Sequence, residues 1–203
     1  MICERIYNNM RIRLAQEKDA AALLEIYKQY IDTNITFEYE LPSKEEFKSR
    51  ILTYAKEYPY FICTENGKCV GYVYAHRAQE RAAYQWNAEL SIYLDKNYHG
   101  KGVGKILYEM MFEILALQGV KTVYGLVTTP NPKSMKLHES TGFILSGTYH
   151  NTGYKAGKWC DVLFYEKQIG EYDLKPTPMT PICKIDRNIL AAIIKKYETM
   201  VQQ

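Results

Sequence analysis

The chain has 203 residues, with 26 Lys and Arg against 23 Asp and Glu, and a formal net charge of +3. Its hydrophobic fraction of 47% and charged fraction of 24% are typical of a folded globular domain and exclude a disordered or collagen-like chain. The small net charge gives no support for a nucleic acid or a membrane as a partner, and we expect neither.

Cysteine and histidine usage points to a reducing compartment without a metal site. The five cysteines show no CxxC spacing, and the four histidines show no spacing typical of metal ligands. No apolar run approaches the roughly 18 residues that span a bilayer, and the first residues lack the apolar stretch of a signal peptide. We therefore expect a cytoplasmic protein with reduced thiols and no bound metal.

The first part of the chain predicts two helices. Apolar residues recur at helical spacing between Ala20 and Ile31. Ser43, followed three residues later by Glu46, is typical of a helix N-terminus with a capping box. The helix that starts there would bury one apolar stripe, made of Phe47, Ile51, Leu52 and Ala55.

The apolar pattern then changes to a period of two, which is typical of β-strands. Strands expected at Tyr60–Glu65 and Cys69–His76 flank Asn66-Gly67, a strong hairpin signal. A third strand is expected over about Tyr84–Asp95. One face of this strand would be apolar, with Ala88, Leu90, Ile92 and Leu94, and the other would carry Glu89, Ser91 and Tyr93.

A glycine-rich segment follows this strand. Gly100, Gly102 and Gly104 directly precede a strong helical pattern. Glycine lets the backbone approach a ligand closely, and a helix N-terminus favours an anion. Lys101 and Lys105 add positive charge, so we expect a phosphate or pyrophosphate here. The spacing fits neither a Walker loop nor a dinucleotide fingerprint, and a solvated turn is the alternative.

The rest of the chain predicts a strand at Val120–Thr128, a short helix from Asn131 to Thr141, and two further strands at Phe143–His150 and Trp159–Lys167. Strands and helices therefore occur in one mixed α/β (α+β) arrangement.

Beyond this region the composition changes. We expect one domain over residues 1–169, followed by a proline-containing linker and an amphipathic helix over residues 170–203. The apolar stripe of that helix, Ile185–Tyr197, would pack on the domain or on a second copy of the chain.

The glycine segment, His99-Gly100-Lys101-Gly102-Val103-Gly104, resembles the acetyl-CoA loop of the GNAT N-acetyltransferases, whose pattern is Gln/Arg-x-x-Gly-x-Gly/Ala. His99 stands where the family usually has Gln or Arg. The segment Asn131–Phe143 resembles the later family pattern NxxSxxLHExxGF. Ala83–Glu89 and Gly157–Val162 resemble the phosphinothricin/methionine sulfoximine N-acetyltransferase branch. The resemblance covers about Ile12–Lys167 and implies the GNAT fold, a mixed central β-sheet flanked by helices, here with an extra C-terminal helix.

The resemblance also implies an acetyl-CoA site, formed by the third strand, the glycine loop and the start of the later helix. Its expected residues are Ile92, Tyr93, Leu94, His99, Gly100, Lys101, Gly102, Val103, Gly104, Lys105, Asn131 and Ser134. A backbone N–H of Ile92 or Tyr93 would polarise the thioester carbonyl. Asn131 is alternatively only the N-cap of its helix, and Ser134 is alternatively only structural.

Two residues are expected to carry out the catalysis. Glu89 is the candidate general base that removes the proton of the amine, directly or through water, and a solvated strand carboxylate is its alternative. His138 stands where many relatives have a tyrosine acid and would protonate the departing thiolate. A histidine that only packs on its helix face is the alternative reading of His138.

The acceptor would be held by a cation and aromatic walls. Arg81 matches a substrate-side arginine of the branch, and a guanidinium can hold a carboxylate or phosphinate with two hydrogen bonds. Gln79 stands where the branch often has a second cation. Phe37 and Tyr84 are the candidate walls, although either is also a plausible core residue.

These residues lead to an expected function: an acetyl-CoA-dependent N-acetyltransferase that acts on the α-amine of a phosphinothricin, methionine sulfoximine or methionine sulfone type of compound. The alternatives are another amine acceptor (a polyamine, an aminoglycoside or a protein N-terminus) and a non-catalytic acyl-CoA-binding module. The resemblance further implies a homodimer.

Overall fold

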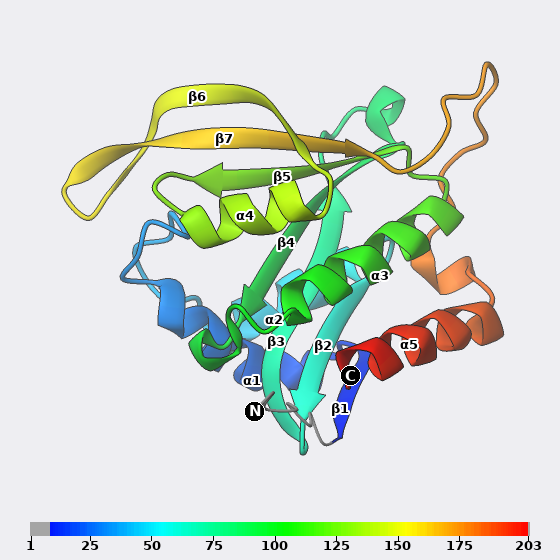
Figure 1. The fold of residues 1–203 in the computed structure, drawn as a ribbon, viewed down its shortest axis with the longest axis horizontal. Helices are drawn as coiled ribbons and strands as arrows, with labels where there is room; N and C mark the ends of the chain where they lie inside the picture. Colours follow the sequence, from blue (N-terminus) through cyan, green and yellow to red (C-terminus); the bar gives the residue numbers. More distant parts are fainter. Residues whose placement is uncertain (1–8, 203) are drawn as a thin grey trace, which may run out of the picture.

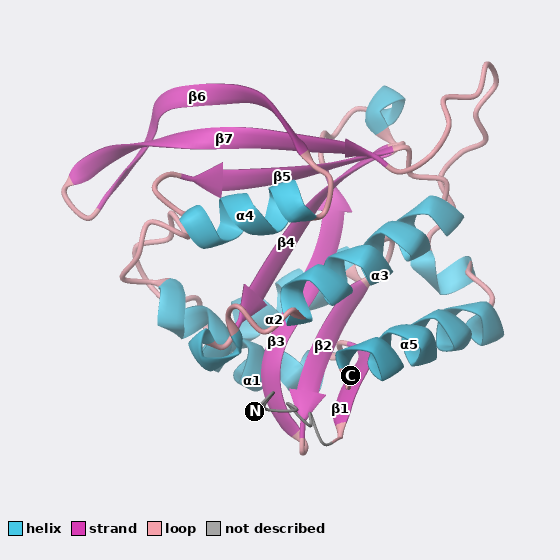
Figure 2. Cartoon of the chain, viewed as in Figure 1, coloured by secondary structure: helices cyan, strands magenta, loops and turns pink. Residues whose placement is uncertain are grey.

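The computed structural model describes residues 9–202, in which seven strands form one mixed sheet in the order β1-β2-β3-β4-β5-β7-β6 (Figures 1 and 2). The strands are β1 (Met10–Leu14), β2 (Tyr60–Glu65), β3 (Lys68–Arg77), β4 (Asn87–Leu94), β5 (Thr122–Thr128), β6 (Ile144–Lys155) and β7 (Lys158–Gln168). The α-helices are α1 (Ala20–Tyr27), α2 (Lys44–Tyr54), α3 (Val103–Leu117), α4 (Pro132–Ser140) and α5 (Arg187–Val201).

The centre of the sheet contains its one parallel pair among these residues, β4 and β5. This pairing is short, because it joins only Asn87, Ala88 and Glu89 of β4 to Thr122, Val123 and Tyr124 of β5. Beyond these rows the two strands separate, and β5 continues with β7 and β6 while β4 continues with β3 (Figure 1). We call the space between the separating strands the fork. The sequence did not predict it.

The two faces of β4 have the chemistry that the sequence predicted. Ala88 and Leu90 are buried in the core beneath α3, whereas Tyr93 packs with the cluster beneath α1 and α2. The strand begins later than expected, since a short 3-10 helix, Ala82–Tyr84, precedes it. Glu89 therefore lies on the α1–α2 side of the sheet, in the last row that β4 shares with β5.

The predicted hairpins and caps are present, with some differences in length. Asn66 and Gly67 have φ values of 50° and 81° and join β2 to β3. Ser43 accepts a hydrogen bond from the Glu46 N–H, as expected, but the Glu46 carboxylate pairs with Arg50 instead of completing a capping box. Leu52 is 46% exposed and is not part of the buried stripe. The hairpin of β6 and β7 is longer than predicted, because its turn lies at Ala156-Gly157.

The C-terminal helix α5 packs on the domain of its own chain, against α3 and the edge strand β1 (Figure 1). Leu190, Ile193, Tyr197 and Val201 are buried there, whereas Ile189 of the predicted stripe is 50% exposed. This packing agrees with the first of the two expected positions of the stripe. The division of the chain at residue 169 stays a prediction.

Side chains from the C-terminal end of α5 also hydrogen-bond to the free edge of β1, a strand that was not predicted from the sequence. The buried Glu198 carboxylate accepts the Ile12 N–H at 2.8 Å, and Gln202 donates to the Met10 carbonyl at 2.9 Å. An edge strand with unpaired backbone groups can pair with a strand of another chain. The Glu198 and Gln202 side chains occupy backbone groups of β1 and so hinder such pairing.

We predict that Glu198→Ala lowers the free energy of unfolding by about 1–3 kcal/mol, because the buried Ile12 N–H loses its acceptor. Chemical denaturation measures the change. Glu198→Gln keeps an acceptor oxygen and is the matched control, with a smaller loss. Equal stability of Glu198→Ala and the wild type would contradict the role given to this contact.

Candidate active site

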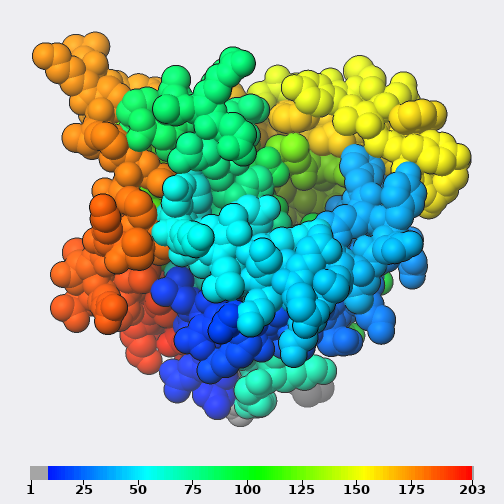
Figure 3. All heavy atoms as spheres, turned by 180° about the vertical axis from the view of Figure 1, so that it is seen from behind, coloured from blue at the N-terminus to red at the C-terminus, as the bar shows by residue number. Residues whose placement is uncertain are grey.

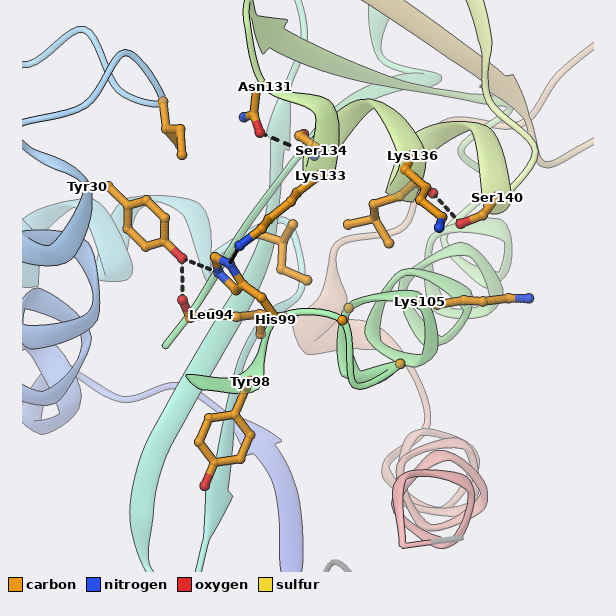
Figure 4. A pocket seen from close by; sticks show the side chains of 16 residues that line it. Tyr30, Leu94, Tyr98, His99, Lys105, Asn131, Lys133, Ser134, Lys136 and Ser140 are labelled. Carbon is orange, nitrogen blue, oxygen red and sulfur yellow. Dashed lines mark hydrogen bonds between the residues drawn. The ribbon is translucent and has the colours of Figure 1, made fainter. Parts of the chain in front are cut away.

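A pocket of about 580 Å³ opens in the fork (Figure 4). Ile92 and Leu94 of β4 form one wall, and Asn131 and Leu137, from the N-cap and the body of α4, form the other. Because β4 and β5 no longer pair here, backbone groups on the fork side of β4 are open to a ligand. The walls thus combine apolar side chains with a strand edge.

The floor of the pocket is the glycine loop and the first turn of α3. Gly102 is the N-cap of α3 with φ 85°, a left-handed conformation that a side chain would strain. Gly104 lies close to Leu137, since a Cβ at this position would be 3.4 Å from the leucine side chain. The N–H groups of a first helical turn have no partner within the helix. The loop therefore brings such groups, with the positive end of the helix dipole, to the pocket.

Three lysines line the same pocket: Lys105 of α3 and Lys133 and Lys136 of α4. Together with the helix N-terminus they place positive charge around the pocket, which is the chemistry that an anion with more than one phosphate group needs. This geometry fits the phosphate site that the sequence predicted.

His99 lines the pocket and contacts residues from two other segments of the chain (Figure 4). Its Nε2 is 2.8 Å from the Tyr30 hydroxyl, and its Nδ1 is 3.2 Å from the Lys133 ammonium. The Tyr30 hydroxyl donates to the Leu94 carbonyl, so it accepts from Nε2–H, and Nδ1 accepts from Lys133. His99 is thus neutral, which agrees with a pKa lowered by burial and by the charge of Lys133.

Most of the predicted cofactor residues line this pocket. They are Ile92, Leu94, His99, Gly100, Gly102, Gly104, Lys105, Asn131 and Ser134. Three do not line it. Val103 is buried in the core, Lys101 lies over the Tyr98 ring, and the Tyr93 side chain packs on Tyr27 on the other face of β4. Asn131 also caps α4, since its Oδ1 accepts the Ser134 N–H at 3.2 Å, so the alternative reading of Asn131 is also present.

Sequence reasoning missed several lining residues: Tyr30, Ile35, Tyr98, Lys133, Lys136, Leu137 and Ser140. The two lysines carried a usable signal, because Lys133 and Lys136 are three residues apart and share one helical face. Tyr30 and Ile35 carried none, since they reach the pocket from a segment far away in the chain.

Glu89 lies where the fork begins, in the last paired row of β4 and β5. Its side chain is 23% exposed, and its Oε1 is 3.6 Å from His76 Nε2 on β3. Sequence reasoning did not select His76. The charge of the Glu89 carboxylate also reaches Tyr108 of α3. Burial and this charge together raise the pKa of the Tyr108 hydroxyl.

His138 is buried in the core and is only 3% exposed. Its Nδ1–H donates to the Ser134 carbonyl at 2.8 Å, and its Nε2 is 3.4 Å from the Tyr108 hydroxyl. Burial lowers its pKa, which favours the neutral ring. The ring fills the space above Gly125, where a Cβ would be 2.1 Å from Nε2. This placement favours the packing role, and a role as the acid stays a prediction.

The predicted acceptor residues do not come together. Phe37, in the segment between α1 and α2, covers Gly153 of β6, where a Cβ would be 2.1 Å from the ring. Arg81 is exposed at the N-cap of the short 3-10 helix before β4, and Tyr84, the last residue of that helix, is 42% exposed.

The segment between α1 and α2 is held to the tip of the β6–β7 hairpin. Tyr39 donates to the Tyr154 carbonyl at 2.6 Å, and the buried Lys155 donates to the Glu38 carbonyl within the same chain. Figure 3 shows this light-blue segment beside the yellow hairpin.

Within residues 9–202 no group of three or more His, Cys, Asp or Glu side chains is placed to hold a metal ion. Across the same residues no helix is long and apolar enough to span a membrane.

The sheet order, the fork and the glycine-capped helix define an acetyltransferase fold. Residues 12–164 match the acetyltransferase (GNAT) domain family, and the chain belongs to this family. It is an N-acetyltransferase. The expected fold, a mixed sheet flanked by helices with a C-terminal helix, is confirmed.

Individual relatives include enzymes named for phosphinothricin and for methionine sulfoximine, the branch that the sequence motifs resemble. The chain is 31% identical over 177 residues to a phosphinothricin N-acetyltransferase of Streptomyces viridochromogenes, covering 87% of this chain and 96% of the relative. It is 26% identical over 167 residues to an L-methionine sulfoximine/L-methionine sulfone acetyltransferase of Salmonella typhimurium, covering 80% and 96%. A crystal structure of a phosphinothricin acetyltransferase from Sinorhizobium meliloti, in complex with acetyl-CoA, has a TM-score of 0.79 and 32% identity and covers 83% of this chain and 93% of that one.

Proposed function

We propose that this enzyme transfers the acetyl group of acetyl-CoA to the α-amine of a small amino-acid analogue of the phosphinothricin, methionine sulfoximine or methionine sulfone type. One observation carries the proposal: a carboxylate, Glu89, lies where a strand fork opens into a pocket with a glycine-capped helix N-terminus. The named relatives and the acetyl-CoA complex of a similar structure support it.

The pocket residues suit acetyl-CoA. The first turn of α3 and Lys105 would bind the pyrophosphate, with Lys133 and Lys136 on its other side. Ile92 and Leu94 would contact the pantetheine arm, which the open edge of β4 can pair as a neighbouring strand does. A backbone N–H of Ile92 or Tyr93 would then stabilise the oxyanion.

Glu89 would take the proton of the acceptor ammonium, directly or through one water. The free amine attacks the thioester carbon, so that the C–N bond forms and the C–S bond breaks. The reaction yields the acetylated amine, CoA thiol and one released proton. Arg81, Phe37 and Tyr84 are proposed to contact the acceptor, and their present separation requires that the acceptor, or a second subunit, bring them to the site.

We predict that Lys133→Ala weakens binding of CoA about tenfold, on the order of 1.4 kcal/mol, because one charge-assisted contact to a phosphate is lost. Isothermal titration calorimetry measures the affinity. Lys195→Ala, an exposed lysine of α5 outside the pocket, is the control. An unchanged affinity of Lys133→Ala would remove this lysine from the site.

The acceptor class is tested with an amine panel that includes phosphinothricin, methionine sulfoximine, methionine sulfone, a polyamine, an aminoglycoside and a peptide N-terminus. Release of CoA thiol gives kcat/KM for each. We expect the three amino-acid analogues to lead. A higher value for another amine would change the acceptor class, and no acceleration by any amine, with CoA still bound, would favour the acyl-CoA-binding module.

In the same assay, Glu89→Gln should lower kcat about 10²- to 10⁴-fold and leave the affinity for CoA unchanged, since the amide cannot accept the proton. Glu166→Gln on β7, in the row that continues across the sheet through Tyr124, is the control. Full activity of Glu89→Gln would show that another group is the base.

We also propose that the enzyme is a homodimer that pairs through the edge strand β6. Four of the side chains on β6 and β7 are large, apolar and more than half exposed: Ile144, Leu145, Tyr149 and Trp159. Such a cluster on a long edge strand is typical of an interface.

Light scattering should therefore give a mass of about twice 23.7 kDa. The double variant Leu145→Glu/Tyr149→Glu should be monomeric, whereas Leu174→Glu, at a fully exposed site in the linker, should not alter the mass. A monomeric wild type at micromolar concentration would refute the dimer.

A further inference from the structure

His76 of β3 lies directly opposite Glu89 of β4 in the antiparallel register. His76 Nε2 and Glu89 Oε1 are 3.6 Å apart, and each side chain is 23% exposed. Both side chains are on the α1–α2 face of the sheet. The proposed base therefore has an imidazole as its immediate neighbour.

The other ring nitrogen determines where the proton lies. His76 Nδ1 is 3.0 Å from the Arg77 backbone carbonyl. A carbonyl only accepts, so Nδ1 carries a hydrogen. When the ring is neutral, the lone pair of His76 Nε2 faces the ionised Glu89 carboxylate, and the two repel each other. One added proton, held between Nε2 and Oε1, turns this repulsion into attraction. The pair is therefore suited to hold one proton.

The surroundings hold the ring in this orientation. His76 stacks on Tyr54 of α2, with ring centroids 5.2 Å apart, and it also contacts Tyr74 on its own strand. The titratable groups that face it are thus Glu89 from β4, Tyr54 from α2 and Tyr74 from β3, while the Arg77 guanidinium pairs with Glu57. Burial lowers the pKa of His76, but the close contact and charge of Glu89, together with the hydrogen bond to the Arg77 carbonyl, outweigh it, and the pKa is raised above 6.5.

We propose that His76 is a positioning residue that stores the proton which Glu89 removes from the acceptor amine. This inference rests on the proposed function and deepens it. The acceptor ammonium loses a proton to Glu89 Oε1, and this proton moves to His76 Nε2. The amine becomes neutral and the pair becomes imidazolium–carboxylate. The proton then passes to water, and the pair returns to its starting state.

The consequence is that the base titrates as a coupled pair and not as a lone carboxylate. The pair with its proton bound cannot take another from the amine. Activity should therefore rise with pH through the pKa of the pair, above 6.5. A histidine that only packed on Tyr54 would have no effect on this pH dependence.

The first test is the pH profile of kcat/KM, with the best amine of the panel, for the wild type and His76→Gln. Glutamine can fill the space but cannot store a proton. We expect the acid limb to move by at least about one pH unit to lower pH and the plateau to fall about 10- to 100-fold. Lys195→Gln is the control, because it changes an exposed side chain of α5 outside the pocket and should alter neither quantity.

The second test does not need activity or a His76 variant. Histidine ring signals are titrated by NMR in the wild type and in Glu89→Gln. We expect the pKa of His76 to lie above 6.5 in the wild type and to fall below 6.5 in Glu89→Gln, where only the weaker effect of the hydrogen bond to the Arg77 carbonyl still opposes burial.

The outcomes separate the two proposals. An unchanged acid limb in a folded His76→Gln enzyme, or a His76 pKa that does not respond to Glu89→Gln, overturns the role of His76 while acetyl transfer stands. If no amine of the panel is acetylated, the proposed function fails, and the NMR titration still decides whether the pair holds the proton. If His76→Gln does not fold, that titration decides alone.

Discussion

The separation of β4 from β5 after Glu89 is the constraint on which the site depends. Two paired strands would use each other's backbone groups and leave no room for a ligand. Because the pairing stops after three rows, one strand edge, one helix N-terminus and one face of α4 all border the same space. The proposed base lies in the last paired row, where the strands begin to separate, and three lysines line the pocket beyond it.

The fork is kept open by packing around it. The α3 helix fills the side beneath β4, and the close approach of Gly104 to Leu137 brings α3 against α4. From the other side, Asn34 in the segment between α1 and α2 contacts the Pro130 carbonyl, and Tyr39 reaches the β6–β7 hairpin. The two halves of the sheet are thus joined across the opening by side chains, where backbone pairing has ended.

The many tyrosines have a common location. Rings from α1, the short 3-10 helix Lys28–Tyr30 after it, α2, β2, β3 and β4 form one continuous cluster on the α1–α2 face of the sheet. Its members include Tyr27, Tyr30, Tyr54, Tyr60, Tyr72, Tyr74 and Tyr93. Rings of this size hold His76 beside Glu89 and Tyr30 beside His99. The cluster thereby extends from the His76–Glu89 contact to His99, which lines the pocket.

Neighbouring residues alone predict most of the local elements and the chemistry of the glycine loop. Alternation along β4 placed Glu89 opposite the apolar face, Asn66-Gly67 specified a turn, and three glycines before an apolar stripe specified a helix N-terminus open to an anion. These are properties of neighbouring residues, and period and turn chemistry encode them directly. Which distant groups meet depends on how the elements pack together: His76 meets Glu89, Lys133 and Tyr30 meet His99, and Glu198 meets the edge of β1. It also placed His138 in the core, because the space above Gly125 and between the rings of Tyr108 and Tyr165 exists only once the sheet and helices have packed.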